Sequence, residues 1–92
     1  MYYILFYKTV ENYVEKRKPF REAHLKLAME AYNNGSIVMA GALAEPADEA
    51  VLVFKGESSA VAEAFAMNDP YVKNGLIIEW KVRSWSVVIG GE

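Results

Sequence analysis

Strand-like and helix-like segments follow one another in this chain in the order strand, helix, strand, strand, helix, strand. Aromatic and β-branched residues, which favour strands, concentrate in residues 2–10, 36–44, 50–55 and 76–89. Apolar residues or alanines at helical spacing occupy residues 19–34 and 59–67. Pro19 suits the first turn of one helix and Gly35 its end, whereas residues 11–18 are polar and form a connection.

This order of elements predicts an α+β fold of the split βαβ, ferredoxin-like type, in which an antiparallel sheet carries both helices on one face. Residues 45–48 form a turn signal, so the strands on either side of it are expected to pair as a hairpin. The chain has 92 residues, the size of one small domain, and we expect residues 1–92 to form a single domain.

Composition excludes several classes of protein and of site. Hydrophobic residues make up 53% of the chain and charged residues 24%, which excludes a disordered protein. The net charge of −2 gives no basic excess for binding nucleic acid. With no cysteine and one histidine, thiolate sites and multi-histidine metal sites are excluded, and we expect neither a metal nor a cofactor.

Membrane and export signals are not evident in the sequence. No apolar run approaches the ~18 residues needed to span a membrane. The first residues, MYYILFYK, lack a basic region and a small-residue cleavage site. We therefore expect a soluble, cytoplasmic protein that does not bind membranes.

The first strand is apolar on both faces. Its alternating residues form two sets, Tyr2, Ile4 and Phe6 on one face and Tyr3, Leu5 and Tyr7 on the other. Two short helices cover only one face of a sheet, and a large exposed apolar patch marks an interface. We therefore predict a homodimer, with two-fold symmetry, through the sheet face that the helices leave bare. The alternative is that the tyrosines of this face tolerate solvent.

His24 and Asp69 are the first candidates for chemistry. His24 is the only histidine, and it lies on the apolar face of the helix 19–34; histidine is the side chain that changes charge near neutral pH. Asp69 precedes Pro70 at the end of the neighbouring helix, where its carboxylate can reach His24 and orient the ring. The alternatives are a structural core histidine and ordinary turn chemistry at Asp69.

Other polar residues near His24 are candidates for binding a ligand. Arg21, one helical turn before His24, can hold a carboxylate or enolate oxygen, or else remain a solvated helix residue. Tyr71 can donate a hydrogen bond at the rim of a pocket, or anchor its loop. Gly41 marks a bulge or a close backbone approach. The basic cluster 16–18 lies among glutamates and is expected to be solvated, although it can attract an anion.

The ordered set of these pieces resembles the YciI-like (YCII-related) family over nearly the whole chain. The pieces are REAHLKL at 21–27, GSIVMAG at 35–41, NDPY at 68–71, GL at 75–76 and VRSW at 82–85. The chain departs from the family where Gly41 is followed by alanine rather than proline, and where serine replaces proline in its R-P-W motif.

The resemblance implies a ferredoxin-like dimeric α/β barrel and an active site built on a His–Asp pair. Carried over to this sequence, the pair is His24 and Asp69. Arg21, Tyr71 and Trp85 match further family positions, and the resemblance implies that they bind substrate.

These features predict a small cofactor-free enzyme acting on a small-molecule ligand. His24, oriented by Asp69, would move a proton on a small carbonyl-containing or ring-derived anion, as in isomerase, lyase or dehydrohalogenase chemistry. Arg21 or a backbone amide would stabilise the enolate that develops. The alternative is a non-catalytic dimer that binds a metabolite or serves as an accessory module. Metal binding by His24 and Asp69 fits poorly, because two ligands do not complete a site.

Overall fold

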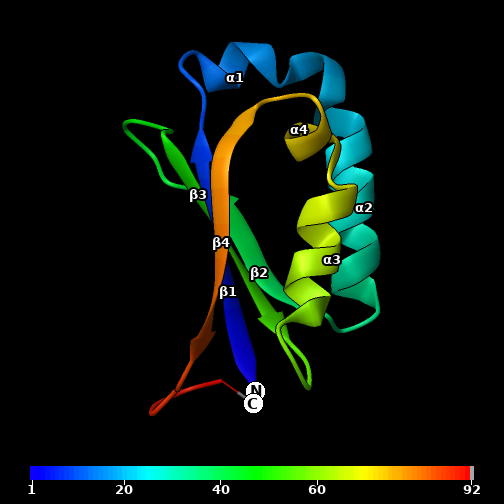
Figure 1. Cartoon of the computed structure of the whole chain (residues 1–92), viewed down its shortest axis with the longest axis vertical. Helices are drawn as coiled ribbons and strands as arrows, with labels where there is room; N and C mark the ends of the chain where they lie inside the picture. Colours follow the sequence, from blue (N-terminus) through cyan, green and yellow to red (C-terminus); the bar gives the residue numbers. More distant parts are fainter. Residues whose placement is uncertain (92) are drawn as a thin grey trace.

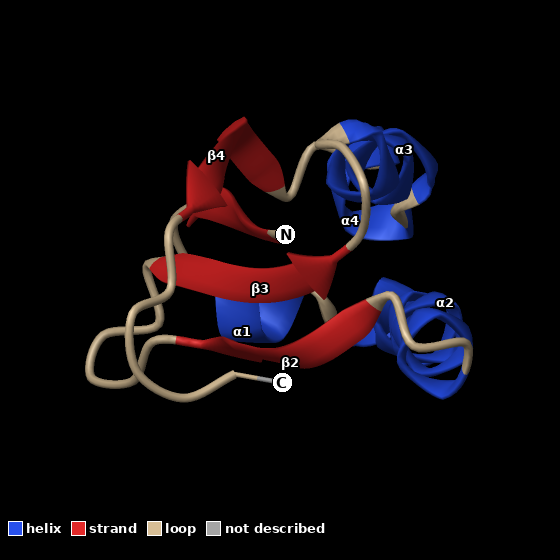
Figure 2. Cartoon of the chain, turned by 90° about the horizontal axis from the view of Figure 1, so that it is seen from below, coloured by secondary structure: helices blue, strands red, loops and turns tan. Residues whose placement is uncertain are grey.

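A computed structural model describes residues 1–91. Its elements are β1 (Tyr2–Thr9), α1 (Tyr13–Lys16), the 3₁₀ turn η1 (Lys18–Phe20), α2 (Arg21–Asn33), β2 (Ile37–Ala42), β3 (Glu49–Lys55), α3 (Ala60–Asn68), α4 (Pro70–Lys73) and β4 (Ile77–Trp85). The strands form one antiparallel sheet in the order β2-β3-β1-β4. Figures 1 and 2 show α2 and α3 side by side on one face of this sheet. The predicted α+β, ferredoxin-like arrangement is confirmed.

Strand register assigns the two faces of the sheet. Tyr3, Leu5 and Tyr7 of β1 are buried on the face that the helices cover. Their partners in β3 are Phe54, Leu52 and Ala50, which are buried with them in the core. The opposite face carries Tyr2, Ile4 and Phe6, with Val51 and Val53 beside them. Within residues 1–91 no helix lies on this second face (Figure 2).

Two short helices occupy segments that the sequence predicted to be a connection or a helix end. Asn12 adopts a left-handed conformation, with φ of 60°, and α1 begins directly after it. Pro70 holds Asp69 in an extended conformation, which ends α3, and then occupies the first position of α4. Neither helix is long enough to show an apolar period, so the left-handed Asn12 marks the start of α1, and Pro70 with the capping carboxylate of Asp69 marks the start of α4.

The last strand is shorter than predicted. Residues 76–89 were expected to form it, whereas β4 spans Ile77–Trp85. The reason is the length of its partner: Trp85 pairs with Tyr2, the first residue of β1, so the ladder has no further partner beyond Trp85. The bulge in β2 lies between Ile37 and Met39, not at Gly41.

Among residues 1–91, none of the helices combines the length and the apolar character that crossing a bilayer requires.

Candidate active site

Asp69 is a fully buried carboxylate at the junction of α3 and α4. Its oxygen Oδ1 accepts a hydrogen bond from the backbone N–H of Tyr71 at 3.0 Å, which caps α4. Its oxygen Oδ2 accepts a hydrogen bond from the hydroxyl of Tyr7 at 2.7 Å. A buried charge is stable only when hydrogen bonds replace its lost water, and both carboxylate oxygens here have such partners.

His24 of α2 meets Asp69 across the gap between the helices. The distance between Nδ1 of His24 and Oδ1 of Asp69 is 2.8 Å, and the histidine side chain is 14% exposed. Because a carboxylate only accepts hydrogen bonds, the proton of the neutral imidazole is assigned to Nδ1. Nε2 then carries the lone pair, and no described residue forms a hydrogen bond with it. The pair therefore presents a basic nitrogen.

Tyr71 of α4 fixes the plane of the His24 ring. The two rings are stacked, with centroids 3.8 Å apart and an angle of 7° between their planes. Tyr13 in turn packs its edge on Tyr71 at 5.7 Å. Tyr71 is 1% exposed, and its hydroxyl has no hydrogen-bond partner among the residues that the structure describes.

The tyrosines of the site remain neutral at physiological pH. Burial, the charge of Asp69 and the hydrogen bond to it raise the pKa of the Tyr7 hydroxyl far above its usual value. Burial also raises the pKa values of Tyr13 and Tyr71, while Arg17 opposes the rise at Tyr13 and Arg21 opposes it at Tyr71. These hydroxyl groups are therefore hydrogen-bond donors and not anions.

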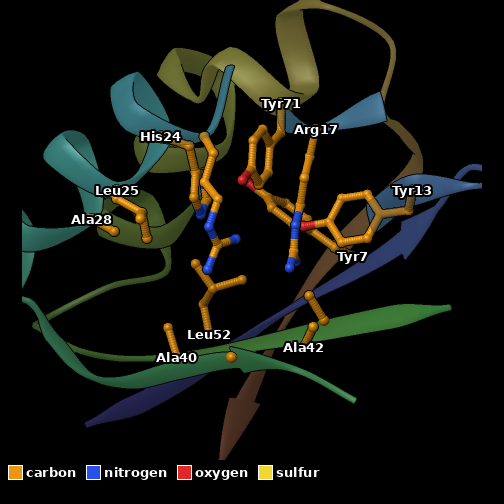
Figure 3. A pocket seen from close by; sticks show the side chains of 13 residues that line it. Tyr7, Tyr13, Arg17, His24, Leu25, Ala28, Ala40, Ala42, Leu52 and Tyr71 are labelled. Atoms are coloured by element: carbon orange, nitrogen blue, oxygen red, sulfur yellow. The ribbon is translucent and has the colours of Figure 1, made fainter. Parts of the chain in front are cut away.

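A cavity of about 220 Å³ opens beside His24, between the helices and the edge strand β2. Its helical side carries the polar groups Tyr13, Arg17, Arg21, His24 and Tyr71, and its floor on β2 and β3 is built from Ala40, Gly41, Ala42, Ala50 and Leu52. Figure 3 shows Arg17 reaching from the helical side toward the strands that carry Ala42 and Leu52. The cavity exists because alanine and glycine on the strands have small or no side chains, and the side chains on the helical side do not fill the remaining space.

The cavity is positively charged in a chain whose net charge is negative. None of the described side chains that line it is acidic. Arg17 is half-buried and lies over the ring of Tyr13, with its guanidinium carbon 5.1 Å from the centroid. Arg21 is more exposed and stands at the rim. Neither arginine pairs with a carboxylate in residues 1–91.

The structure brings four of the five predicted site residues together. His24 contacts Asp69, and both Arg21 and Tyr71 line the cavity with His24. Trp85 does not line it: it pairs with Tyr2, on the sheet face that the helices leave bare. The expected contact between Trp85 and substrate stays a prediction.

Tyr7, Tyr13 and Arg17 were not singled out as site residues from the sequence. Arg17 was expected to be solvated with its basic neighbours, yet α1 turns it into the cavity. Strand alternation placed Tyr7 on one face with Tyr3 and Leu5, but nothing in the sequence indicated its hydrogen bond to Asp69. The described residues contain no cluster of three or more side chains suited to hold a metal ion.

Solved structures share this fold at low sequence identity. The chain superposes on 5-chloro-2-hydroxyhydroquinone dehydrochlorinase (TftG) of Burkholderia phenoliruptrix, solved as a complex with 2,5-dihydroxybenzoquinone, with a TM-score of 0.78, 21% identity and 94% coverage of each chain. The structured domain of Caenorhabditis elegans BMY-1 gives a TM-score of 0.56, with 16% identity over 96% of this chain and 99% of that one. A NIPSNAP family protein of Agrobacterium tumefaciens gives 0.55, with 13% identity over 89% and 87%.

Sequence comparison identifies the family. No curated protein matches the chain. The family model described as the YCII-related domain matches residues 1–86, which include every element of the fold and every residue of the cavity. The chain therefore belongs to the YCII-related family.

Proposed function

We propose that this protein is an acid–base enzyme that transfers protons on a small carbonyl-containing or ring-derived anion, with His24 as the group that takes and returns the proton. One observation carries the proposal: a fully buried Asp69 holds Nδ1 of His24 at 2.8 Å, while the same ring faces a cavity. A histidine oriented by a carboxylate and open to a ligand is the arrangement that general acid–base catalysis requires.

Each group around His24 has a part in the proton transfer. Nε2 accepts the proton from the bound ligand, and the negative charge of Asp69 stabilises the imidazolium that forms. The hydrogen bonds from Tyr7 and from the Tyr71 amide hold the carboxylate in place. Arg21 stabilises the enolate or phenolate oxygen as its charge develops.

The likeness to TftG supports a dehydrohalogenase reaction within this class. For 5-chloro-2-hydroxyhydroquinone, His24 would take a hydroxyl proton and return it to the ring carbon that bears chlorine. A second hydroxyl proton is then removed, a carbonyl forms, and the C–Cl bond breaks with its electron pair leaving as chloride. The net change is loss of HCl, with no change that needs an external oxidant.

Chloride release from 5-chloro-2-hydroxyhydroquinone by the purified protein tests this proposal. We expect His24→Gln to lower the rate on the order of 10²–10⁴-fold, since that is the usual contribution of a positioned acid–base group. Asp69→Asn should also lower it, while the exposed Asp48→Asn, the same chemical change outside the cavity, should not. If the compound binds without chloride release, the non-catalytic binding module is the better description.

We also propose that two chains associate through the bare face of the sheet. The support is the apolar centre of that face, where Ile4 pairs with Val53 and Phe6 with Val51 in the register of β1 and β3. Light scattering should give twice the chain mass of 10.3 kDa. Ile4→Lys should yield a monomer, whereas Glu30→Lys on the exposed surface of α2 should leave the dimer intact; a wild-type monomer would contradict the proposal.

A further inference from the structure

We propose that the cavity selects a compact dianion, and that Arg17, Arg21 and the hydroxyl of Tyr71 bind its oxygen atoms. This inference concerns the same cavity as the proposed function and rests on it for the place of the ligand. It adds the charge and size of the ligand, and it assigns a binding role to Arg17.

The first argument is charge. Arg17 and Arg21 bring two permanent positive charges to a cavity whose described lining contains no carboxylate. Asp69 forms no ion pair with either arginine, because its oxygens accept hydrogen bonds from Tyr7, the Tyr71 amide and His24 instead. A guanidinium that is half-buried without a carboxylate partner, as Arg17 is, gains most from a ligand that brings negative charge. A half-buried guanidinium at Arg17 and a more exposed one at Arg21 in the same cavity favour a ligand with two charges.

The second argument is the unsatisfied hydroxyl of Tyr71. Burial raises the pKa of this hydroxyl, so it stays protonated and is a donor. Arg21 lies close enough to oppose that rise, but no described atom meets the hydroxyl in hydrogen-bond geometry. A buried polar group without a partner costs free energy, and native proteins retain such groups where a ligand or water satisfies them. The Tyr71 side chain lies on the cavity wall beside His24 (Figure 3).

The third argument is size and shape. A cavity of about 220 Å³ is smaller than the pockets that hold drug-sized ligands, while ~150 Å³ suffices for a benzene ring. The floor is apolar, formed by alanines, glycine and Leu52, and the polar groups stand on the opposite wall. A flat ring can rest on this floor with its charged oxygens toward the arginines. A ligand of one ring or of equal size therefore fits, and a nucleotide does not.

Three isosteric probes separate charge from shape. Terephthalate carries two carboxylates, 4-carbamoylbenzoate carries one, and terephthalamide carries none, while the ring and its substituent positions are the same. Calorimetric titration of the wild-type protein should show terephthalate binding at least ~10-fold more tightly than 4-carbamoylbenzoate, with terephthalamide weakest. Equal affinity for the dianion and the monoanion would overturn the proposal.

Variants then test the assigned residues. Arg17→Gln and Arg21→Gln should each weaken terephthalate binding on the order of 10-fold and reduce the preference for the dianion. Lys16→Gln is the matched control, because it removes the same charge one residue from Arg17 and does not line the cavity. If Lys16→Gln weakens binding as much as Arg17→Gln does, the loss comes from the changed net charge of the protein, and the assignment of Arg17 as a binding residue is wrong.

Tyr71→Phe separates a binding role from a structural one. Because the hydroxyl has no hydrogen-bond partner within residues 1–91, its removal should leave the melting temperature equal to that of the wild type or higher. The same change should weaken terephthalate binding several-fold. A stable Tyr71→Phe variant with unchanged affinity would contradict the binding role.

These measurements need no turnover, so the two proposals fail in different ways. His24→Gln should still bind terephthalate, since the arginines remain. Arginine-dependent selection of the dianion, without chloride release from any chlorinated substrate, would remove the enzymatic proposal and leave this one. Chloride release without selection of the dianion would support the enzymatic proposal and overturn the dianion proposal.

Discussion

The imidazole of His24 lies parallel to the phenol ring of Tyr71, with ring centroids 3.8 Å apart. The stack fixes the plane of the histidine, and the hydrogen bond from Nδ1 to Asp69 fixes the direction of the ring within that plane. Two contacts, one from Asp69 at the junction between α3 and α4 and one from Tyr71 in α4, thus orient a ring that belongs to α2. Together they set the orientation of the one histidine ring that lines the cavity.

The neutral form of His24 should be the tautomer with its proton on Nδ1. The reason is that the carboxylate of Asp69 accepts a hydrogen bond at that nitrogen. Nitrogen-15 NMR distinguishes the two tautomers, and the single histidine of the chain makes the assignment direct. In Asp69→Asn the amide can donate to Nδ1, so the proton should move to Nε2. A wild-type protein with its proton on Nε2 would show that the pair is not formed in solution.

Removal of the Tyr7 hydroxyl should destabilise the protein. Tyr7→Phe deletes the 2.7 Å hydrogen bond to Asp69 and leaves one oxygen of a buried carboxylate without that donor. We expect a loss of about 1.5–3 kcal/mol in the free energy of unfolding, the usual range for a hydrogen bond to a charged group. Urea denaturation measures it, with the exposed Tyr32→Phe as the control. An unchanged midpoint would mean that Asp69 does not depend on Tyr7.

Alkaline pH should destabilise the fold through its buried tyrosines. The pKa values of Tyr7, Tyr13 and Tyr71 are raised in the folded state, so the unfolded chain loses their protons first, near pH 10. Their contribution to stability is therefore complete below about pH 10 and is lost as the pH rises toward the folded-state values. Unfolding free energies measured from neutral to strongly alkaline pH check this decline.

The variant Tyr7→Phe provides the control for the alkaline decline. It lacks the group whose pKa is raised furthest, so its stability should fall less steeply above about pH 10. A parallel decline in both proteins would assign the effect to other groups.

Filling the cavity from its floor should block ligand binding and spare the fold. Ala40 lies on the cavity side of β2 and is exposed, so Ala40→Leu adds volume where no described side chain must move aside. We expect terephthalate binding to be lost in calorimetry, while the melting temperature stays within a few degrees. Met39→Leu changes the neighbouring residue, which does not line this cavity, and should bind normally. Normal binding by Ala40→Leu would place the ligand elsewhere.

The order of elements was predictable because apolar periodicity and turn residues agree over long segments. The helices α1 and α4 were not, since each has four residues and depends on its ends: the left-handed Asn12 and the capping carboxylate of Asp69. Local conformation at a single residue leaves almost no trace in a pattern of hydrophobicity.

The contact between His24 and Asp69 was predictable because it follows from two helices that lie side by side. Contacts that depend on the direction of a single side chain were not predictable. Both helices had to lie on one face, which brought His24 and Asp69 within range. Arg17 was missed because a basic cluster among glutamates has the composition of a solvated surface, and only the path of α1 turns it inward. Trp85 was placed with the site by family resemblance, although strand alternation sets it on the opposite face from Trp80.

The carboxylate of Asp69 caps α4 with the same oxygen that holds His24. Local unfolding of α4 therefore also releases the imidazole, and a molecule with a frayed α4 has no oriented base. The amide proton of Tyr71 is protected from exchange with solvent deuterium only while that cap is closed. Its exchange rate consequently reports the fraction of molecules in which α4 is open and the site is not assembled. The stability of this four-residue helix therefore sets an upper limit on the fraction of molecules that have an oriented His24.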